Sequence, residues 1–571
     1  MAFEYWLTEI AFSDGSSIKL TKGEAIIIVG PNNAGKSRAL RDIQNFIQNN
    51  REQLVVVKNV GEHRGGTSQE LKDHLLRNFS FKIEGSSTAN NFSDYNISGG
   101  FNFVWGTEGD STTWRPFLVQ RLDIEQRLAA SKPAPSFDPL QALPSHPVHR
   151  LYNDDQLMQR LNEWVQRAFK QKIAIDLRGG STIPLYAGAV PELAAGERAT
   201  DTSYIKKLRT ETTPLHQQGD GMRAFVGVLI NTLLLGFKVH LIDEPEAFLH
   251  PPQAQLLGEI LCSFTEPDRQ LILSTHSGDF LRGVLKSQRN PIRIVRVRRT
   301  GNINHVKTIT PELIKKFWSD PILLHSNVLD GIFHEKVVIC ESEADSRFYG
   351  AIADALRTSK DHKFLNDIMF VYGGGKHAIS KLGNALRQLD VPLAAVVDID
   401  ILRDEKPLRS IVEAFGGTWH DIESPWRTVR DGIAKLPPLK DYSEVLTLLK
   451  DEIAKLESSK TRQTPRLFPQ DNAKRIENAL RSRSPGALLK ASGRSALPQG
   501  QETEAFDQLV GNLKKIGIFV VELGELERFV QTVGGKGPRW VNDVLARYAG
   551  ELITSPDLEQ ARRFVSQFIT E

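Results

Sequence analysis

The chain has 571 residues, 40% of them apolar, which is enough for more than one domain with a buried core. Its 72 Lys and Arg residues nearly balance 69 Asp and Glu residues, so the formal charge of +3 excludes a globally basic nucleic-acid binder and leaves only a local patch. The two cysteines, Cys262 and Cys340, lie far apart in apolar surroundings, which excludes a disulfide framework and favours a reducing cytoplasm.

Strand and helix signals alternate from the start of the chain. Strands are expected in "EYWLTEIAF", "SSIKLT" and "EAIIIVG", followed by a helix from Lys36, and this order is typical of an α/β layered fold. The acidic residues of the first segment also exclude a signal peptide. Prolines interrupt the stretch from 131 to 148, which predicts a loop or hinge.

The segment that follows, "LYNDDQLMQRLNEWVQRAFKQ", predicts an amphipathic helix. Its apolar face is formed by Leu157, Leu161, Trp164, Val165 and Phe169. This helix either packs on its own domain or serves as a dimerisation arm. The apolar run at 224–237 is shorter than the roughly 20 residues of a membrane span, so we expect a core helix there and no membrane partner.

Further strands are expected in "KVHLIDE", "RQLILSTH", "IRIVRVRR", "VVICESE", "FLNDIMFVYGGG" and "VPLAAVVDIDILRD". Several are apolar runs that end in polar residues or glycine. Buried parallel strands have this composition, and their carboxyl ends carry the functional residues of an open α/β sheet.

The segment "GPNNAGKS" matches the phosphate-loop pattern G-x-x-x-x-G-K-[ST] between an apolar strand and a helix. In this motif backbone amides surround the phosphates, the lysine reaches the β- and γ-phosphates of ATP, and the serine ligates Mg²⁺. We expect the nucleotide to be held by Gly30, Asn33, Gly35, Lys36 and Ser37. A glycine turn that binds nothing is the alternative.

Acidic residues end a second apolar strand, "VHLIDEPEAFLHP". Asp243 is expected to hold the Mg²⁺ hydration shell, and Glu244 to activate the attacking water. His276 ends the next strand, in "LILSTHS", and should lie beside Asp243 as a catalytic residue. A core histidine is the alternative for His276.

Two glycines precede an apolar helix in "QQGDGMRAF". The order of all these motifs resembles the ABC-type ATPases of DNA repair and chromosome maintenance, although Gln218 and Gly219 stand where a serine is common. The resemblance implies that Gly219 and Gly221 contact the nucleotide of an opposite subunit, and that ATP drives dimerisation. A plain helix N-cap is the alternative for both glycines.

A second group of carboxylates follows residue 330. Glu341 ends one strand, Asp345 lies one helical turn later, and Asp398 and Asp400 end another strand in "VVDID". Alternate residues of a strand point to one face, so the Asp-x-Asp spacing predicts two parallel side chains. Such a group favours bound Mg²⁺ or Mn²⁺, because nearby like charges repel without a cation. Separate solvated acids are the alternative.

This pattern resembles Toprim domains, which have a glutamate after the first strand and Asp-x-Asp after a later one. With the ATPase motifs in front, the chain resembles the OLD (overcoming lysogenization defect) family of ATP-dependent nucleases, on the residues "GPNNAGKS", "STHS", "CESEAD", "YGGGKHAI" and "VVDID". One departure is Ser342, where Toprim proteins usually have glycine. The resemblance implies a nuclease site built on these carboxylates.

Nuclease members of the family also use a later glutamate and lysine. Here "GELERFVQTVGGKGPRWV" supplies Glu527 as a metal ligand, with Glu525 as its competitor, and Lys536 as a catalytic charge or an ordinary loop lysine. Lys376 of "YGGGKHAI" either meets a nucleic-acid backbone or belongs to a simple turn. The basic stretch after Lys455 either guides nucleic acid or is a solvated loop.

Together these observations predict an ABC-type P-loop ATPase domain at residues 1–330, with a helical or dimerisation insertion at about 130–210. A Toprim α/β domain is expected at residues 331–571, with a basic insertion at about 455–510. The predicted function is an ATP-regulated, Mg²⁺-dependent DNA endonuclease or nickase that acts as a homodimer or larger oligomer. The resemblance implies prokaryotic anti-phage defence, with room for a further defence-system protein or RNA partner. The alternatives are an ATP-dependent DNA-binding clamp or sensor with a second half that does not cut, and an RNA nuclease acting on tRNA.

Overall fold

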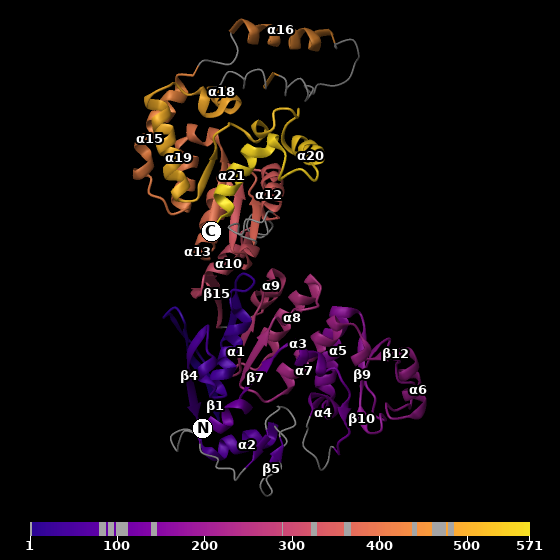
Figure 1. Cartoon of the computed structure of the whole chain (residues 1–571). Coiled ribbons are helices and arrows are strands. Elements are labelled where there is room, and N and C mark those ends of the chain that lie inside the picture. The colour runs from indigo at the N-terminus through magenta and orange to yellow at the C-terminus, as the bar shows by residue number, and fades with distance from the viewer. Residues whose placement is uncertain are drawn as a thin grey trace. The chain divides into compact units, whose positions relative to one another are not determined.

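The computed structural model describes residues 3–78, 87–89, 96–98, 105, 112–138, 146–287, 289, 291–320, 328–358, 367–436, 442–458, 476–477 and 485–570 (Figure 1). The chain divides into two compact units, Met1–Lys316 and Phe317–Glu571, whereas the sequence pattern predicts a boundary at 330. Both cysteines are buried and unbonded. No helix of the described ranges is long and apolar enough to cross a membrane.

The first unit is built on a six-stranded sheet, and this confirms the predicted α/β class. In spatial order its strands are β16 (Ile303–Ile309), β15 (Ile292–Thr300), β3 (Ala25–Val29), β14 (Gln270–Ser274), β13 (Val239–Asp243) and β7 (Val119–Leu122). All are parallel except β16. Every residue of β3 is buried, because helices and a second sheet cover both faces of this sheet.

Helices connect the strands of this sheet and cover it. They are α1 (Lys36–Ile47), α3 (Ile124–Ala129), α7 (Asp220–Leu234), α8 (Pro251–Phe264) and α9 (Gly278–Lys286). The predicted core helix is confirmed, since most side chains of α7 are buried. A second, antiparallel sheet contains β2 (Ser17–Lys19), β1 (Glu4–Phe12) and β4 (Val57–Gly65), followed by α2 (Ser68–Asn78). The short strands β5 (Ser87–Ala89) and β6 (Asn96–Ser98) pair with each other.

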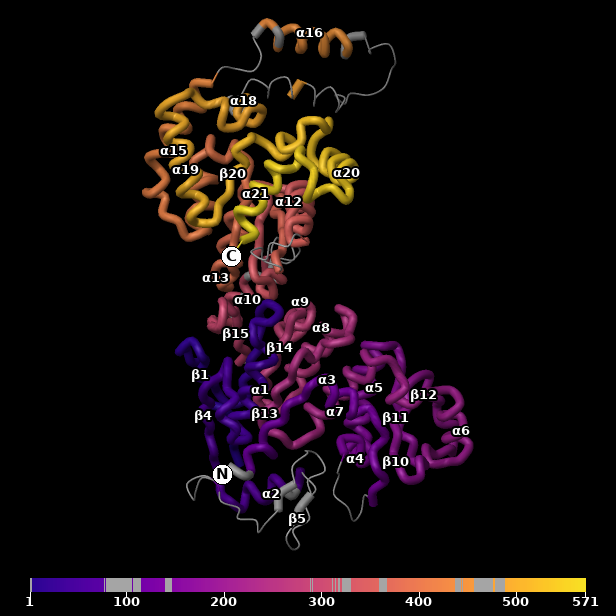
Figure 2. The backbone as a smooth tube through the Cα atoms, in the orientation of Figure 1, coloured from indigo at the N-terminus to yellow at the C-terminus, as the bar shows by residue number. Residues whose placement is uncertain are grey.

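The segment predicted as a helical insertion is mixed in structure. Its helices are α4 (Pro147–Tyr152), α5 (Asp155–Phe169) and α6 (Thr202–Glu211). It also contains an antiparallel sheet of β9 (Lys172–Ile175), β11 (Leu185–Gly188) and β12 (Thr212–Pro214), and the pair β8 (Ala134–Pro135) and β10 (Thr182–Ile183). Figure 2 shows these elements as a lobe beside the strands and helices of the first unit's core. The strands were missed because their short, weakly alternating sequences carry little periodic signal.

The second unit contains a four-stranded, all-parallel sheet. In spatial order its strands are β18 (Ile368–Tyr372), β17 (Lys336–Cys340), β19 (Leu393–Asp398) and β20 (Ile518–Val521). One face packs on α12 (Glu343–Arg357), α20 (Gly537–Arg547) and α21 (Glu559–Ile569), and α13 (Lys376–Gln388) packs against β17 and β19. Chain order reverses between β17 and β19, and ligands bind at such switch points in open α/β sheets.

Further helices belong to the second unit. They are α14 (Glu405–Ala414), α15 (His420–Ala434), α16 (Tyr442–Ser458), α18 (Pro485–Ser492) and α19 (Gln501–Lys515), and α10 (Pro311–Trp318) lies across the boundary between the units. Within the predicted basic insertion, residues 459–475 and 478–484 lie outside the described residues.

Candidate functional site

The phosphate loop between β3 and α1 has the backbone conformation that its motif requires. Gly30 and Gly35 have φ values of 144° and 101°, and a Cβ on Gly30 would lie 2.1 Å from the carbonyl oxygen of Val297. Asn33 is also left-handed, with φ at 61°. Gly35 caps α1 without a side-chain hydrogen bond. The first amides of α1, which include that of Ser37, are therefore directed at the place where an anion would bind.

Lys36 is the buried cation of this loop. Its Nζ donates to the carbonyl oxygens of Gly30 and Pro31, at 2.8 and 2.9 Å. Asn304 of β16 holds the loop from outside by donating to the Ala34 carbonyl oxygen at 2.6 Å. The loop and its lysine therefore form a compact cradle, in which the ammonium group can exchange backbone carbonyls for phosphate oxygens.

The carboxyl ends of β13 and β14 bring Asp243, Glu244 and His276 together, as the sequence predicts. Asp243 pairs in register with Ser274, whose hydroxyl donates to the Asp243 carboxylate at 2.5 Å. His276 Nδ1 lies 3.2 Å from Glu244 Oε1. This contact lowers the pKa of Glu244 and raises that of His276, and the positive charge of Lys36 acts on both groups. A core histidine is excluded because His276 is exposed at the sheet edge.

Two further charged residues support this edge, and the sequence reasoning missed both. Glu246 is buried, and its Oε1 accepts hydrogen bonds from the Thr275 hydroxyl at 2.6 Å and the His276 amide at 3.2 Å. Burial raises the pKa of Glu246. Arg127 of α3 is fully buried and donates to the Glu244 carbonyl oxygen at 2.7 Å. Glu246 is the second glutamate of "DEPE", so its place beside the predicted residues of this motif could have indicated its role. No local sequence pattern indicates the role of Arg127.

Gly219 and Gly221 lie at the start of α7, where Gly219 is the N-cap without a side-chain hydrogen bond. A Cβ on Gly221 would lie 2.7 Å from the carbonyl oxygen of Phe248, so close packing accounts for that glycine. Contact with the nucleotide of an opposite subunit stays a prediction for both.

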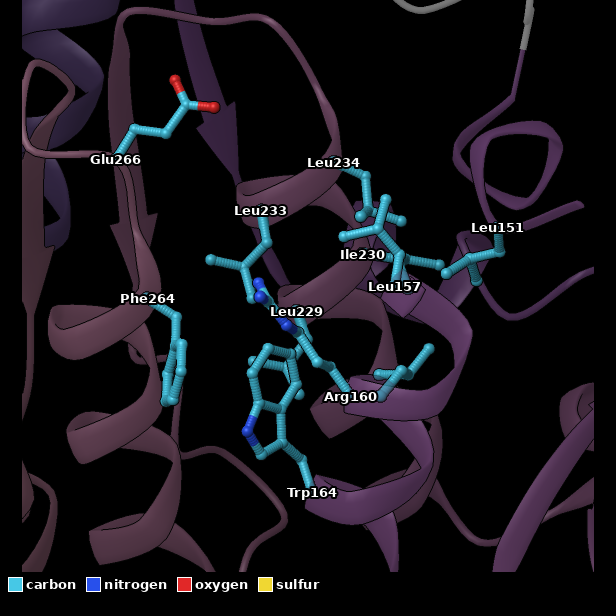
Figure 3. A pocket seen from close by; sticks show the side chains of 11 residues that line it. Leu151, Leu157, Arg160, Trp164, Leu229, Ile230, Leu233, Leu234, Phe264 and Glu266 are labelled. Atoms are coloured by element: carbon cyan, nitrogen blue, oxygen red, sulfur yellow. The ribbon is translucent and has the colours of Figure 1, made fainter. Parts of the chain in front are cut away.

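Figure 3 shows an apolar pocket of about 170 Å³ in the first unit, lined by residues of α4, α5, α7 and α8. Trp164 of α5 lies there with its ring 5.0 Å from that of Phe264. Leu161 and Val165 of the same helix are buried. The apolar face of α5 therefore packs on its own unit, one of the two alternatives expected for it. The pocket lining contains none of the predicted site residues.

In the second unit, Glu341 and Asp398 meet at the switch point of the parallel sheet. Glu341 follows β17, Asp398 ends β19, and the Asp398 amide donates to Glu341 Oε1 at 3.0 Å. The Gly375 amide donates to the Glu341 carbonyl oxygen at 3.0 Å, which places the glycine-rich turn after β18 beside them. The ends of these strands therefore lie side by side in the fold, as the sequence predicts.

Asp400 lies near Asp398 for a different reason from the predicted one. The strand ends at Asp398, and Asp400 belongs to the 3-10 helix η6 (Ile399–Arg403), so strand alternation does not align the two side chains. A single ammonium group joins them, since Lys490 Nζ lies 2.9 Å from Asp400 Oδ2 and 4.0 Å from Asp398 Oδ2.

Asp345 is both a helix cap and a member of the carboxylate group. It closes a capping box at the start of α12, accepting hydrogen bonds from the Ser342 amide and hydroxyl, both at 2.9 Å. Burial raises the pKa of Asp345, and the negative charge of Glu527 raises it further. Ser342 therefore has a definite task at the position where Toprim proteins usually have glycine.

Burial and mutual repulsion raise the pKa values of two carboxylates in this group, so they resist ionising at the same time. Burial raises the pKa of Glu341 to about 7, with Asp400 and Asp345 adding to the effect. It raises the pKa of Asp398 well above its usual range, with Glu341 and Asp345 adding to it. We use the name "carboxylate cluster" for Glu341, Asp345, Asp398 and Asp400.

Two lysines neutralise one member of the carboxylate cluster. Burial alone would raise the pKa of Asp400, but the ion pairs with Lys376 and Lys490 outweigh it and lower that pKa. Lys376 therefore faces the cluster from the start of α13. The Lys490 position was missed, because the sequence shows it only as part of a basic stretch. As they stand, no three Asp, Glu, His or Cys residues of the described ranges form a group that could hold a metal ion.

The two later residues predicted for this site have different surroundings. Glu527 Oε1 accepts a hydrogen bond from the Gly537 amide at 2.6 Å, and its charge acts on Asp345. Lys536 pairs with Glu525, at 3.1 and 3.4 Å, and its side chain is 76% exposed. The structure thus associates Glu527 with the carboxylate cluster and Lys536 with the competing glutamate.

The comparisons with known proteins bear most directly on the identity of the first unit. Residues 26–282 match the family described as "AAA domain, putative AbiEii toxin, Type IV TA system". The chain is 26% identical to the Old nuclease of Escherichia phage P2 over 166 residues, which cover 28% of this chain and 27% of that protein. The matched family and the loop geometry identify the first unit as an ATPase-type domain.

Solved SMC head structures also match. A head bound to the C-winged helix domain of ScpA gives a TM-score of 0.33 at 12% identity, covering 55% of this chain and 100% of that chain. The SMC head domain from Thermotoga maritima gives 0.27 at 10% identity, covering 54% and 99%. Both TM-scores are low, so neither similarity adds to the assignment of the fold.

Proposed function

We propose that the chain is an ATP-regulated, Mg²⁺-dependent DNA endonuclease or nickase, with a Toprim-type nuclease site in the second unit. The observation that carries the proposal is the carboxylate cluster at the switch point of a parallel sheet. Glu341 and Asp398 meet there, and Glu527 acts on the cluster through Asp345. The partial similarity to the phage P2 Old nuclease supports the same function.

Hard oxygen ligands are what Mg²⁺ and Mn²⁺ prefer, so the chemistry of the carboxylate cluster fits these ions. Burial raises the pKa values of Glu341 and Asp398, the neighbouring carboxylates raise them further, and a divalent cation bound among these groups would lower both. Glu341, Asp345, Asp398, Asp400 and Glu527 are the residues we assign to metal binding. Bound ions would activate water and stabilise the leaving oxygen.

For this, Lys376 and Lys490 have to move off Asp400, because their ammonium groups occupy both of its oxygens. The turn before Lys376 is open on its outer side, since a Cβ on Gly374 or Gly375 would meet nothing within 4 Å.

In the ATPase unit, we assign Lys36 to the β- and γ-phosphates, and Ser37 and Asp243 to the Mg²⁺ ion that accompanies ATP. Glu244 is the base that orients the attacking water, and His276 holds its carboxylate at 3.2 Å.

We further propose that ATP favours a homodimer in which Gly219 and Gly221 meet the opposite nucleotide. We also propose a role in anti-phage defence, on the family resemblance alone, which a plaque assay on expressing cells would test.

The experiment is a cleavage assay on supercoiled plasmid and on purified tRNA with Mg²⁺ or Mn²⁺, with and without ATP. Asp398→Asn should abolish nicking and keep ATP hydrolysis. Glu413→Gln, which changes an exposed acid of α14 in the same unit, is the matched control and should cleave normally. Plasmid retention without strand scission would replace the proposal with a DNA-binding clamp, and cleavage of tRNA alone would replace DNA with RNA.

A further inference from the structure

Lys490 is a cation built into the carboxylate cluster from an unexpected part of the chain. It lies on α18, and its Nζ is 2.9 Å from Asp400 Oδ2 and 4.0 Å from Asp398 Oδ2. The side chain is 37% exposed, so the ammonium group faces both the carboxylates and solvent. A substrate phosphate approaching the cluster from solvent would therefore meet this ammonium group.

The backbone around Lys490 is fixed by close packing. A Cβ on Gly524, which has φ at 123°, would lie 2.1 Å from the Lys490 carbonyl oxygen. Leu489 beside it is fully buried. The Arg494 amide donates to the Glu522 carbonyl oxygen at 2.8 Å and ties the end of this segment to the loop after β20. These contacts hold the backbone that carries Lys490, so its side chain starts from a defined position beside the carboxylate cluster.

The other lysines near this site are placed differently. Lys376 pairs with the other oxygen of Asp400 and follows a glycine turn with open space around it. Lys536 pairs with Glu525 and, at 76% exposure, is the most exposed of the three lysines. Of the three, Lys490 combines a closely packed backbone with positions near both Asp398 and Asp400.

We propose that Lys490 contacts a non-bridging oxygen of the phosphate being cleaved and is a catalytic residue of the second unit, in the role that the family resemblance gives to Lys536. This inference rests on the proposed nuclease function. In phosphodiester hydrolysis a water oxygen bonds to phosphorus, the bond from phosphorus to the leaving sugar oxygen breaks, and one water proton replaces phosphorus on that oxygen. Lys490 makes and breaks no covalent bond, but its charge stabilises the negative charge that grows on the phosphate oxygens.

The test compares Lys490→Ala, Lys490→Arg and Lys536→Ala with Lys435→Ala, which changes an exposed lysine that pairs with Glu502. Lys490→Ala should lower kcat for plasmid nicking by about 100-fold, as is typical for loss of one charge-stabilising donor. Its KM should change little, Lys490→Arg should recover part of the rate, and Lys536→Ala should lose less. ATP hydrolysis should persist in all four.

A binding measurement separates this role from a structural one. Calorimetry with Mn²⁺ should show tighter binding to Lys490→Ala than to the parent, because a cation that competes for Asp400 has been removed. Weaker Mn²⁺ binding together with lost cleavage would overturn the inference in favour of a structural lysine. Equal nicking by the parent and Lys490→Ala would overturn the inference alone, and a parent that cuts neither plasmid nor tRNA would overturn the proposed function as well.

Discussion

Replacing Glu341 with Gln should stabilise the metal-free second unit at pH 8 while it removes the proposed nuclease activity. The folded chain raises the pKa of Glu341 from 4.5 to about 7, chiefly through burial. Each tenfold change in proton affinity corresponds to about 1.4 kcal/mol, so the ionised group costs the folded state about 3 kcal/mol. A glutamine keeps an oxygen that can accept the Asp398 amide hydrogen bond and carries no charge.

The pH dependence follows from the direction of this shift. Because the folded state binds the proton more tightly, the stability conferred by a protonated Glu341 is present below about pH 4.5 and is lost as pH rises to about 7. The gain from Glu341→Gln should therefore be about 1 kcal/mol at pH 5.5 and about 3 kcal/mol at pH 8.

Amide hydrogen exchange of peptides that cover β17 and β19, measured with a chelator present, reads the free energy of opening directly. Glu343→Gln is the matched control, since it makes the same change at an exposed glutamate of the next helical turn and should give little gain. Equal protection of the parent and Glu341→Gln at pH 8 would refute the assignment of Glu341 to a strained, buried cluster.

Three further outcomes test the first unit. Lys36→Ala should abolish ATP hydrolysis in a phosphate-release assay, because the loop loses the charge that meets the β- and γ-phosphates, and normal turnover would remove ATP from the proposal. Glu244→Gln should bind ATP but hydrolyse it very slowly and should form dimers with ATP by light scattering, whereas a monomer under all conditions would contradict the ABC-type assembly. Asp42→Ala should destabilise the unit by about 3 kcal/mol in calorimetry, because the amides of Val55, Val56 and Val57, the last two of them buried, lose their carboxylate acceptor at 3.0, 2.6 and 3.1 Å, and an unchanged melting transition would contradict this.

Functional residues at the ends of strands can be predicted well from this sequence, because an apolar run followed by an acidic residue is a local pattern. Glu341 and Asp398 each follow an apolar run, and parallel strands bring their carboxyl ends to one edge without further information. The same rule places the strand that ends in Asp243 beside the strand that leads to His276. Side chains on helices and irregular segments reach a site through tertiary packing, which no local pattern encodes. The predictions missed residues of this kind.

Lys490 shows the difference most clearly. It lies 90 positions after Asp400 in the chain, in a basic stretch that predicts either a guide for nucleic acid or a solvated loop. Its contact depends on the packing of Gly524 against its carbonyl, which no periodicity encodes. Arg127 is a similar case, because its role is a hydrogen bond to the Glu244 carbonyl oxygen across 117 positions.

The acidic residues at the strand ends of the two units differ in how their charge is neutralised. This difference favours a separate role for each group of acids. In the first unit, Glu244 has its own partner in His276, and the contact lowers its pKa. In the second unit, both lysines bind Asp400 and Lys490 lies 4.0 Å from Asp398, but the pKa values of Glu341 and Asp398 are still raised. The contact with His276 keeps Glu244 ionised, whereas carboxylates that repel one another in a shared site gain most from an incoming divalent cation.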